Sequence, residues 1–260
     1  MLKRPPLIAV LAAVLGASLV APAALAGPMV VGPNGNTQSI DVRVKPRKLP
    51  RSGLAPATLE VTTKTTSTTD PSGVPIPARR AVVDFDRSIS LFTNGLPTCD
   101  PGRLQSVSTE QARSVCRRAQ IGTGHATVLL PLAGKVFVEP AVVTAFHGPR
   151  VNGNPTVLLH AYGVAPVQTT LVLSGPVTRF GRQGIGWRID LDIPRIAGGV
   201  GALTDFHVKI NRRWRFKRRQ RSFISAGCPS SKRMRSRGTF TFADGEALTA
   251  ISVRGCAQRR

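Results

Sequence analysis

The sequence predicts a mostly β protein, an antiparallel β-sandwich or open barrel with one short α-helix. Apolar and polar residues alternate with a period of two along most of the chain. The 25 Gly and 21 Pro residues recur between these runs as turn signals. With 260 residues, of which 42% are hydrophobic, the chain can bury a sizeable core. We expect a signal peptide at 1–26, a loosely ordered lead with one short strand at 27–56, and a single β-rich domain at 57–260.

The first residues predict export from the cell. Lys3 and Arg4 precede an apolar run at 7–20, and Ala24-Leu25-Ala26 is a small-x-small cleavage site. Cleavage after Ala26 would give a secreted or cell-surface protein with no transmembrane span in the mature chain. The alternative is an uncleaved membrane anchor, because the apolar run nearly reaches spanning length. Pro22 and the cleavage site favour removal.

The first β segments differ in how clearly they alternate. Residues 40–44 form a short strand, and residues 45–56 form a loop because they hold three prolines and four basic residues. The next alternating run starts at Leu59 and enters a Thr-rich stretch at 62–69. Threonine suits a strand and this stretch lacks Pro, so we favour a strand over a glycosylated linker. Residues 81–85 and 89–92 are further short strands.

One segment has the signature of a helix. Ser108 can cap its start, and Gln111, three residues on, can complete a capping box. The predicted helix spans 109–119 and places Ala112, Val115, Cys116 and Ala119 on one face. We therefore expect this face, with its cysteine, to lie against the core.

The four cysteines predict two disulfide bonds, because an exported chain meets an oxidising environment. The sequence-local pairing, Cys99–Cys116 with Cys228–Cys256, is favoured since each pair encloses a compact unit. The two other connectivities remain open. A zinc site is disfavoured because no CxxC or HxxxH spacing occurs.

From residue 122 onward the pattern is β throughout. Pro131 and Pro140 separate three strands at 125–130, 135–139 and 141–147. Asn152-Gly153 predicts a hairpin turn between 141–146 and 156–162. A strand at 167–173 should break at Gly175-Pro176, and residues 187–193 form a two-faced strand. The glycines of the GRQGIG segment at 181–186 precede no helix, so they are interpreted as loop and not as a phosphate site.

The C-terminal segment predicts a β-hairpin. Asp244-Gly245 is taken as a two-residue turn between 238–243 and 246–253. Ile251 and Val253 should continue the apolar face that begins at the two phenylalanines. The predicted cross-strand pairs are Ala243–Glu246, Phe242–Ala247 and Phe240–Thr249.

A second hairpin carries an unusual concentration of charge. Residues 203–216 alternate as a strand, and residues 222–226 are interpreted as its returning partner. The segment 212–221 holds seven cations and no acid, and a second basic cluster follows at 230–237. We predict anion binding by Arg212, Arg213, Trp214, Arg215, Lys217, Arg218, Arg219 and Arg221, together with Lys232, Arg233 and Arg235.

The overall charge agrees with an anionic partner. The chain has 36 Lys and Arg against 13 Asp and Glu, a net charge of +23. A GC-rich genome would also enrich Arg, but it does not explain the clustering, and a charge run is often only a solvated face. Nucleic acid is an unlikely partner, since aromatic residues make up 5% and no RNP, zinc-finger or helix-turn-helix pattern occurs. Envelope polymers or membrane head groups are the expected partners.

No catalytic signature is recognisable, and the sequence predicts neither a cofactor nor a metal. His125, His147, His160 and His207 lie in separate β segments without ligand spacing. Two carboxylate pairs, Asp84 with Asp86 and Asp190 with Asp192, lie two residues apart on strands and could form a glycosidase-like dyad. The alternative is that arginines neutralise them.

A further indication is a resemblance. The segments CDP, EQARSVCRRAQIGTGHA, LLHAYG, IPRIAGGVGALTDF and SAGCP, then FTFADG and the last cysteine, span Cys99 to Cys256. Together they resemble uncharacterised exported β-rich proteins of high-GC Gram-positive bacteria. This resemblance implies compartment and architecture only, because that group has no assigned activity, and it assigns no functional residue.

We therefore expect a non-catalytic protein of the cell envelope or the extracellular space that binds anionic partners through the basic hairpin. One alternative is a carrier of an apolar or lipid ligand in a curved β-sheet, which needs a lined cavity of several hundred Å³. A second is a secreted hydrolase, whose sign would be clustered acids in a cleft. The sequence does not predict an oligomeric state.

Overall fold

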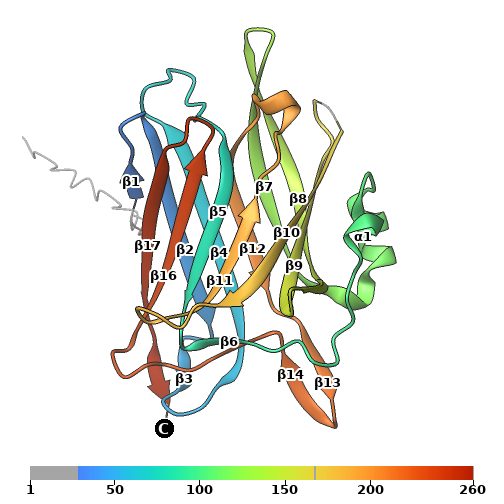
Figure 1. The fold of residues 1–260 in the computed structure, drawn as a ribbon, viewed down its shortest axis with the longest axis vertical. Helices are drawn as coiled ribbons and strands as arrows, with labels where there is room; N and C mark the ends of the chain where they lie inside the picture. Colours follow the sequence, from blue (N-terminus) through green and yellow to red (C-terminus); the bar gives the residue numbers. More distant parts are fainter. Residues whose placement is uncertain (1–28, 167, 260) are drawn as a thin grey trace, which may run out of the picture.

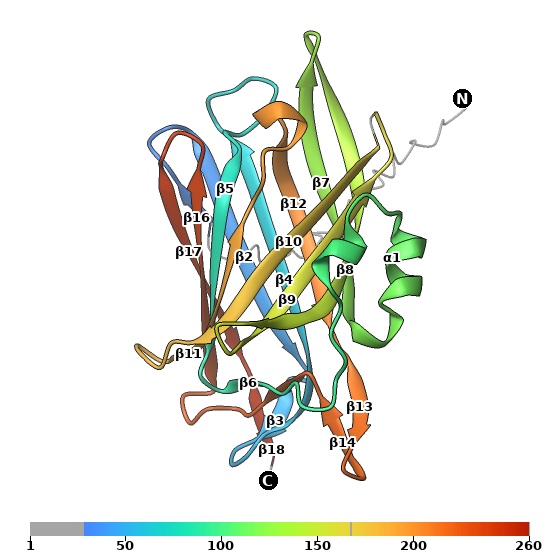
Figure 2. The same cartoon turned by 45° about the vertical axis from the view of Figure 1, so that its right-hand side comes forward.

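The computed structural model describes residues 29–166 and 168–259, so the predicted signal peptide lies outside the described residues. One antiparallel sheet of 14 strands curls into a nearly closed barrel, with a single α-helix on its outer face (Figures 1 and 2). The predicted mostly β fold with one short helix is confirmed, in its barrel form. No helix within the described ranges is both long enough and apolar enough to cross a membrane.

The elements have the following bounds. The first half contains β1 (Met29–Val31), β2 (Asn36–Lys45), β3 (Lys48–Pro50), β4 (Ala55–Ser67), β5 (Ala78–Asp86), β6 (Ile89–Leu91), a 3₁₀ turn at Pro101–Leu104, α1 (Thr109–Val115), a 3₁₀ turn at Arg117–Ala119, β7 (Gln120–Leu132) and β8 (Lys135–Val151). The second half contains β9 (Asn154–Gly163), β10 (Thr169–Arg179), β11 (Ile185–Asp192), a 3₁₀ turn at Ala197–Gly199, β12 (Ala202–Ile210), β13 (Arg213–Phe216), β14 (Arg219–Ser222), β15 (Ile224–Ala226), β16 (Arg233–Phe242), β17 (Ala247–Gly255) and β18 (Ala257–Arg259).

The strand order is β1-β2-β4-β12-β7-β8-β9-β10-β11-β5-β16-β17, and β15 pairs with β4 and with β6. Strands β2 and β17 lie side by side without a backbone ladder, which leaves a seam (Figure 1). Side chains bridge it: the Val42 N–H donates to Ser252 Oγ at 3.0 Å, and Arg254 Nε donates to Asp41 Oδ1 at 2.6 Å. Hydrogen bonds that involve side chains thus close the barrel at this seam, where β2 and β17 form no backbone ladder.

The predicted lead takes part in this sheet. Strand β2 pairs with β4 from Asn36–Ser67 to Lys45–Thr58, so the Thr-rich run is a strand, as the sequence analysis favoured. The segment interpreted as a loop at 45–56 contains β3, which pairs in parallel with β18. Alternating side chains of β4, among them Leu59 and Val61, enter the main core inside the barrel.

Both disulfides form as predicted, whereas the helix forms over only part of its predicted range and Val115, expected to face the core, is exposed. The Ser108 side chain accepts from the Gln111 N–H and the Gln111 side chain accepts from the Ser108 N–H, which completes the capping box. The α-helix stops at Val115, and a 3₁₀ turn replaces the predicted last turn. Disulfides join Cys99 to Cys116 and Cys228 to Cys256. The first belongs to a small core, with Phe146 and Leu158, between α1 and the outer face of β8 and β9.

The prolines expected to end strands do not end them. Pro131 lies within β7, and Pro140 lies within β8 just before the β8–β9 pairing begins at Ala141. Because β8 has no β9 partner there, the missing N–H at 140 removes no β8–β9 hydrogen bond. Gly175-Pro176 is not a break either: β10 pairs with β9 up to Pro176 and with β11 from Val177.

The two predicted hairpin turns have different outcomes. Asn152-Gly153 forms the β8–β9 turn with positive φ at both residues, as predicted. The C-terminal register is wrong by one residue, because Ala243–Gly245 form a three-residue loop with Gly245 at φ 89°. A shift of one residue exchanges the faces, so Val253 is exposed and not part of the apolar face. The observed pairs are Phe240–Leu248 and Thr239–Thr249, with Phe242 hydrogen bonded to Glu246.

Candidate functional site: the basic finger

The segment Arg212–Arg221 forms a separate two-stranded hairpin, which we call the basic finger. Strand β12 ends at Ile210, and the N–H groups of Asn211 and Arg212 both donate to the Ile121 carbonyl, at 3.1 and 3.2 Å. Strands β13 and β14 then project from one end of the barrel (Figures 1 and 2). The predicted hairpin with a basic head is therefore present. Its strands differ from the prediction, since the outgoing strand is broken after Ile210 and the return consists of β14 and β15.

The tip of the finger is a two-residue turn made by Lys217 and Arg218. Their φ angles are 48° and 61°, and Phe216 pairs with Arg219 across the turn. Positive φ at both central positions is typical of a type I′ turn, which normally holds Asn-Gly because other side chains are strained there. Two cationic side chains thus occupy positions where glycine or asparagine would be more stable.

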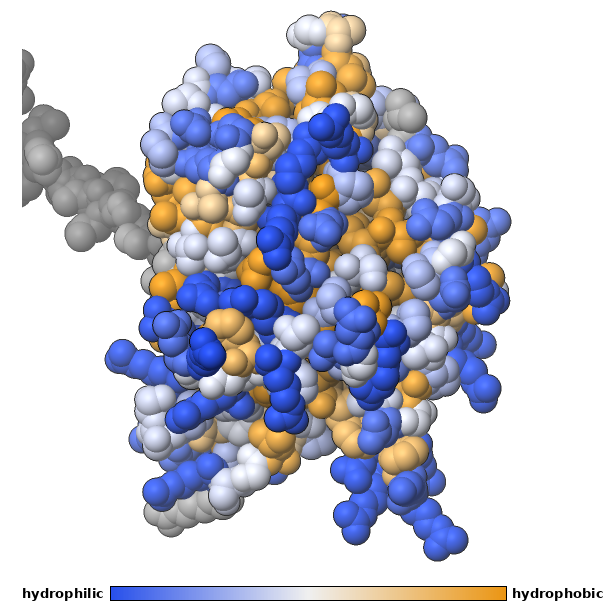
Figure 3. Space-filling model, viewed as in Figure 1, coloured by the Kyte–Doolittle hydropathy of each residue, from blue (hydrophilic) through white to orange (hydrophobic). Residues whose placement is uncertain are grey.

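The outward surface of the finger is cationic. Arg213 and Arg215 lie on one face of β13, and Lys217, Arg218 and Arg219 surround the tip, all of them exposed. Figure 3 shows hydrophilic side chains projecting at this end. Among the described residues no acidic side chain forms an ion pair with any cation of the finger. The charge is therefore available to an external anion.

The inward surface anchors the finger to the barrel. The Trp214 ring stacks on Phe92 with centroids 5.9 Å apart, and its Nε1–H donates to the Asn94 carbonyl at 3.2 Å. The Phe216 ring packs against the Phe92 ring with centroids 6.1 Å apart, and the Arg221 guanidinium lies 4.9 Å from the Phe92 centroid. Trp214, predicted as an anion-site residue, thus anchors the hairpin through the ring face that contacts Phe92. The sequence analysis did not find Phe92 or Asn94, because no local signal links them to the finger.

The base of the finger adds cations that the sequence analysis did not group with it. Arg212 is half-buried, and its Nη2 donates to the Arg118 carbonyl at 3.3 Å. This contact brings the exposed Arg117 and Arg118, which follow α1, next to the finger. Two segments almost one hundred residues apart therefore form one basic surface.

The second predicted cluster lies at the same end of the barrel. Lys232, Arg233 and Arg235 are exposed around the start of β16, beside the Cys228–Cys256 disulfide. A hollow of about 310 Å³ beside them is lined by Arg235 and Arg237 with Gln183 and Ile185. Figure 1 places this cluster at the other side of the barrel end from the finger, so the structure does not merge the two.

The two ends of the barrel differ in charge. In an antiparallel sheet successive connections alternate between the ends. The end that bears the finger, here called the basic end, also carries the β2–β4, β10–β11 and β15–β16 connections and the C-terminal strand (Figure 1). Its additional cations are Arg47, Lys48, Arg51, Arg182 and Arg259, whereas Asp70, Asp244 and Glu246 lie in connections at the opposite end.

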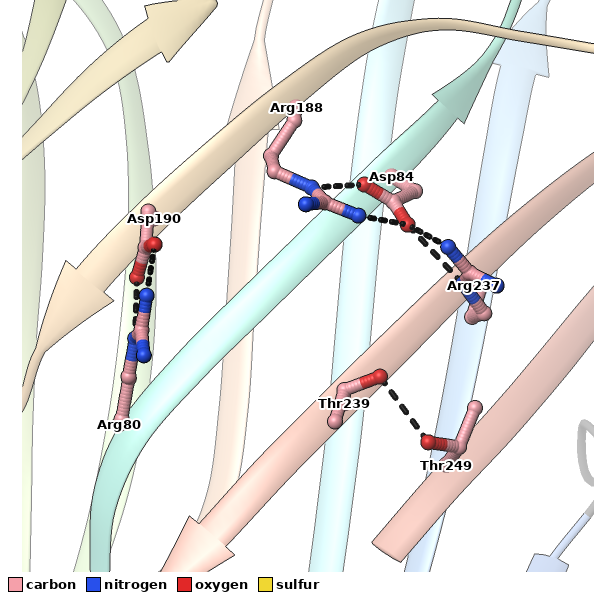
Figure 4. Close-up of polar contacts among 7 residues, drawn as sticks. All are labelled: Arg80, Asp84, Arg188, Asp190, Arg237, Thr239 and Thr249. Atoms are coloured by element: carbon pink, nitrogen blue, oxygen red, sulfur yellow. Dashed lines mark hydrogen bonds and ion pairs between the residues drawn. The ribbon is translucent and has the colours of Figure 1, made fainter. Parts of the chain in front are cut away.

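The predicted carboxylate pairs are bound by arginines. Asp84 on β5 is 1% exposed and lies between Arg188 of β11 and Arg237 of β16, with Nε–oxygen distances of 2.7 and 2.9 Å (Figure 4). Burial pushes the Asp84 pKa up, but the two arginines outweigh it and hold the pKa below its usual value. Asp190 is paired with Arg80. In each pair at least one carboxylate is therefore held in a structural ion pair.

The four histidines occupy two kinds of position. His147 and His160 are buried and hydrogen bonded to the carbonyls of Pro97 and Val107, at 3.1 and 3.0 Å, and burial lowers the pKa of both. His125 and His207 stack across β7 and β12 with ring centroids 5.1 Å apart. In the part of the chain that the structure describes, no group of three His, Cys, Asp or Glu side chains could hold a metal ion.

The sequence-predicted cations that the structure brings together are those of the finger, with Arg117 and Arg118 added at its base. Comparison of the chain with family models, with curated proteins and with solved structures finds no match.

Proposed function

We propose that the protein is an exported, non-catalytic binding protein whose basic finger attaches it to a phosphate-bearing anionic polymer of the cell envelope. The observation that carries the proposal is the set of five exposed cations on a hairpin without an acidic partner. Two disulfides support an oxidising, extracellular compartment.

The geometry favours a flexible polyanion as the partner. Arg213 and Arg215 are two residues apart on one strand face, so their side chains are about 7 Å apart along the strand. A linear polymer with regularly spaced phosphates can contact several such cations in succession, and each contact releases counterions. Because Trp214 and Phe216 hold the hairpin against Phe92, the cations are positioned before the polymer binds.

The test is a titration of the mature chain with purified teichoic acid over a series of salt concentrations. Changing Arg213, Arg215, Arg218 and Arg219 to Gln should weaken binding and reduce the slope of log K against log salt by about 3. The matched control changes four exposed cations away from the finger, Arg87, Arg103, Lys135 and Arg195, to Gln and so has the same net charge. Equal losses of affinity in both variants would show that binding depends on net charge alone and would refute a finger site.

Anionic vesicles and single-stranded DNA serve as competing partners in the same titration. The proposal requires that teichoic acid binds more tightly than either at equal phosphate concentration. Preference for vesicles would identify a membrane surface instead. Preference for DNA would overturn the assignment to an envelope polymer.

A further inference from the structure

The interior of the barrel contains three voids, which have no role in the finger's function. Their volumes are about 100, 60 and 70 Å³, and their walls are almost entirely apolar. Leu159 of β9 and Phe206 of β12 line all three, so the voids meet at these two side chains. Apolar voids of this kind remain dry and accept apolar molecules.

One buried carboxyl group points to a ligand in this interior. Glu139 on β8 is 2% exposed and lines the void of about 60 Å³. The Thr169 hydroxyl hydrogen bonds to its carboxyl group, but Oε1 has no partner. Burial raises the Glu139 pKa above its ordinary value, although the hydrogen bond from Thr169 acts in the opposite direction. Buried polar atoms are nearly always hydrogen bonded, and Oε1 departs from that rule beside an empty space.

Small residues keep the space around Oε1 open. Ala126 on β7, Ala141 on β8 and Ala161 on β9 line the same void. A Cβ atom at Gly163 would lie 2.3 Å from Glu139 Oε1, so glycine is needed for the carboxyl group to fit. Larger apolar side chains such as Leu173 and Leu203 complete the lining of the same void. The cavity beside the acid is therefore built into three neighbouring strands.

Exposed valines lie at the end of the barrel nearest Glu139. Val138 precedes Glu139 and is 62% exposed, Val164 follows Gly163 and is 64% exposed, and Val200 in the β11–β12 connection is 45% exposed. Figure 1 places the β7–β8, β9–β10 and β11–β12 connections together at this end, opposite the basic end, and Figure 3 shows hydrophobic residues there. An apolar molecule would meet this end first.

We propose that the barrel interior binds a slender alkyl or isoprenyl chain with one hydroxyl group, which hydrogen bonds to Glu139 Oε1 while the chain follows the voids past Leu159 and Phe206. A hydroxyl group satisfies Oε1 without bringing a charge into the apolar interior. A carboxylate or an ammonium group would lose its hydration there and would bring a charge into the apolar interior. The voids are too small for a bulky ring system, which limits the ligand to a chain.

The direct test uses 1-octanol as the probe and methyl NMR of the mature protein as the readout. Octanol should shift the methyl signals of Val143, Leu159 and Leu173, which line the voids, and octanoate at neutral pH should bind at least about tenfold more weakly. Unshifted interior methyl groups, or equal binding of octanoate, would overturn the proposal.

Variants of Glu139 separate a binding role from a structural one. Glu139→Leu should raise the unfolding temperature, because it removes a buried unpaired oxygen, and should weaken octanol binding about tenfold. Asp192→Asn, at an exposed carboxylate, is the control and should change neither property. A destabilised Glu139→Leu protein with unchanged octanol affinity would assign Glu139 to the fold alone and refute the proposal.

Filling the void tests the site without touching the acid. Ala161→Leu should abolish octanol binding while the protein stays folded by circular dichroism. If the Ala161→Leu protein does not fold, Ala141→Val is used in its place. Octanol binding that survives in a folded filled variant would place the ligand elsewhere. The four-glutamine finger variant should bind octanol normally, which keeps this test independent of the polymer site.

Discussion

The indole N–H of Trp214 donates to the backbone carbonyl of Asn94 at 3.2 Å and so ties the basic finger to a connection 120 residues earlier in the chain. The same ring stacks on Phe92, which also contacts Phe216 and Arg221. The orientation of the finger therefore depends on this aromatic contact, and the charge of the finger can be changed without altering the contact.

Trp214→Ala should loosen the finger without changing its charge. Loss of a half-buried ring and its hydrogen bond should lower the unfolding free energy of the finger by about 2 kcal/mol. Hydrogen exchange at 212–222 should accelerate, and polymer affinity should fall several-fold because the cations are no longer pre-positioned. Trp214→Phe, which keeps a ring, is the control and should show a smaller effect on both. Unchanged exchange in the Ala variant would contradict the anchoring role.

The strained tip predicts a stabilising substitution that weakens binding. Replacing Lys217 by Asn and Arg218 by Gly suits the positive φ angles and should raise the unfolding free energy by about 1 kcal/mol. The same change removes two cations and should reduce the salt slope of polymer binding by about 1.5. Gln at both positions removes the same charge without relieving strain, so only the Asn-Gly variant should gain stability in a denaturant titration.

The Asp84 ion triad predicts a large cost on substitution. Asp84→Asn leaves Arg188 and Arg237 without their buried partner and should lower stability by about 3 kcal/mol at neutral pH. Because the Asp84 pKa is lowered in the folded protein, the stabilisation by this ion triad is fully present above pH 3.8, the ordinary pKa of an aspartate. It is lost as the pH falls through the lowered pKa. Denaturant titrations of wild type and variant should therefore converge in acid. Asp190→Asn, at an exposed pair, is the comparison and should cost less than about 1 kcal/mol.

The buried histidines predict a separate loss of stability at milder pH. The pKa of His160 is lowered by burial, so below its ordinary value of 6.5 the unfolded chain binds more protons than the folded one. Unfolding free energy should thus fall as the pH drops from 6.5 toward 5. His160→Gln retains a donor for the Val107 carbonyl and should reduce this slope, whereas Gln105→Asn, an exposed change that removes no histidine, should not. Equal slopes in all three proteins would refute the assignment.

The Cys99–Cys116 disulfide should protect a local region and not the whole barrel. Removing it by Ala at both positions should cost about 3 kcal/mol for a closed loop of 17 residues. Hydrogen exchange should increase at 93–119, where α1 covers Phe146 and Leu158, while the barrel strands stay protected. Removing Cys228–Cys256 should instead expose the ends of β16 and β17. A uniform rise of hydrogen exchange over the whole chain after removal of Cys99–Cys116 would contradict this local role of the disulfide.

The features predicted correctly depend on short-range interactions. The capping box needs only Ser108 and Gln111, and the β8–β9 turn needs only Asn152-Gly153. Both disulfides join cysteines that are close in sequence. The wrong register at the C-terminal hairpin shows the limit of this approach, since Asp244-Gly245 suits either a two-residue or a three-residue loop. The observed loop also has the Ala243 N–H donating to the Pro77 carbonyl, a contact from another connection.

The same distinction between short-range and long-range interactions applies to the candidate site. Local composition identified the cations of the finger, but not that Trp214 faces the barrel or that Arg118 joins its base. Glu139 lies in an apolar run, and an acid in such a run was the signal that could have drawn attention to it. Its unpaired oxygen and the void that Ala126, Ala141 and Ala161 help to line are visible only in the tertiary structure.

The sequence by itself determined the β class, the helix and the existence of a basic hairpin, and it favoured the observed cysteine pairing, because each depends on residues near one another along the chain. Only the tertiary structure decided the closure of the barrel at β2 and β17, the gathering of cations at one end, and the cavity beside Glu139. These features depend on strand order and register, which are fixed when distant segments pack together to bury one common core.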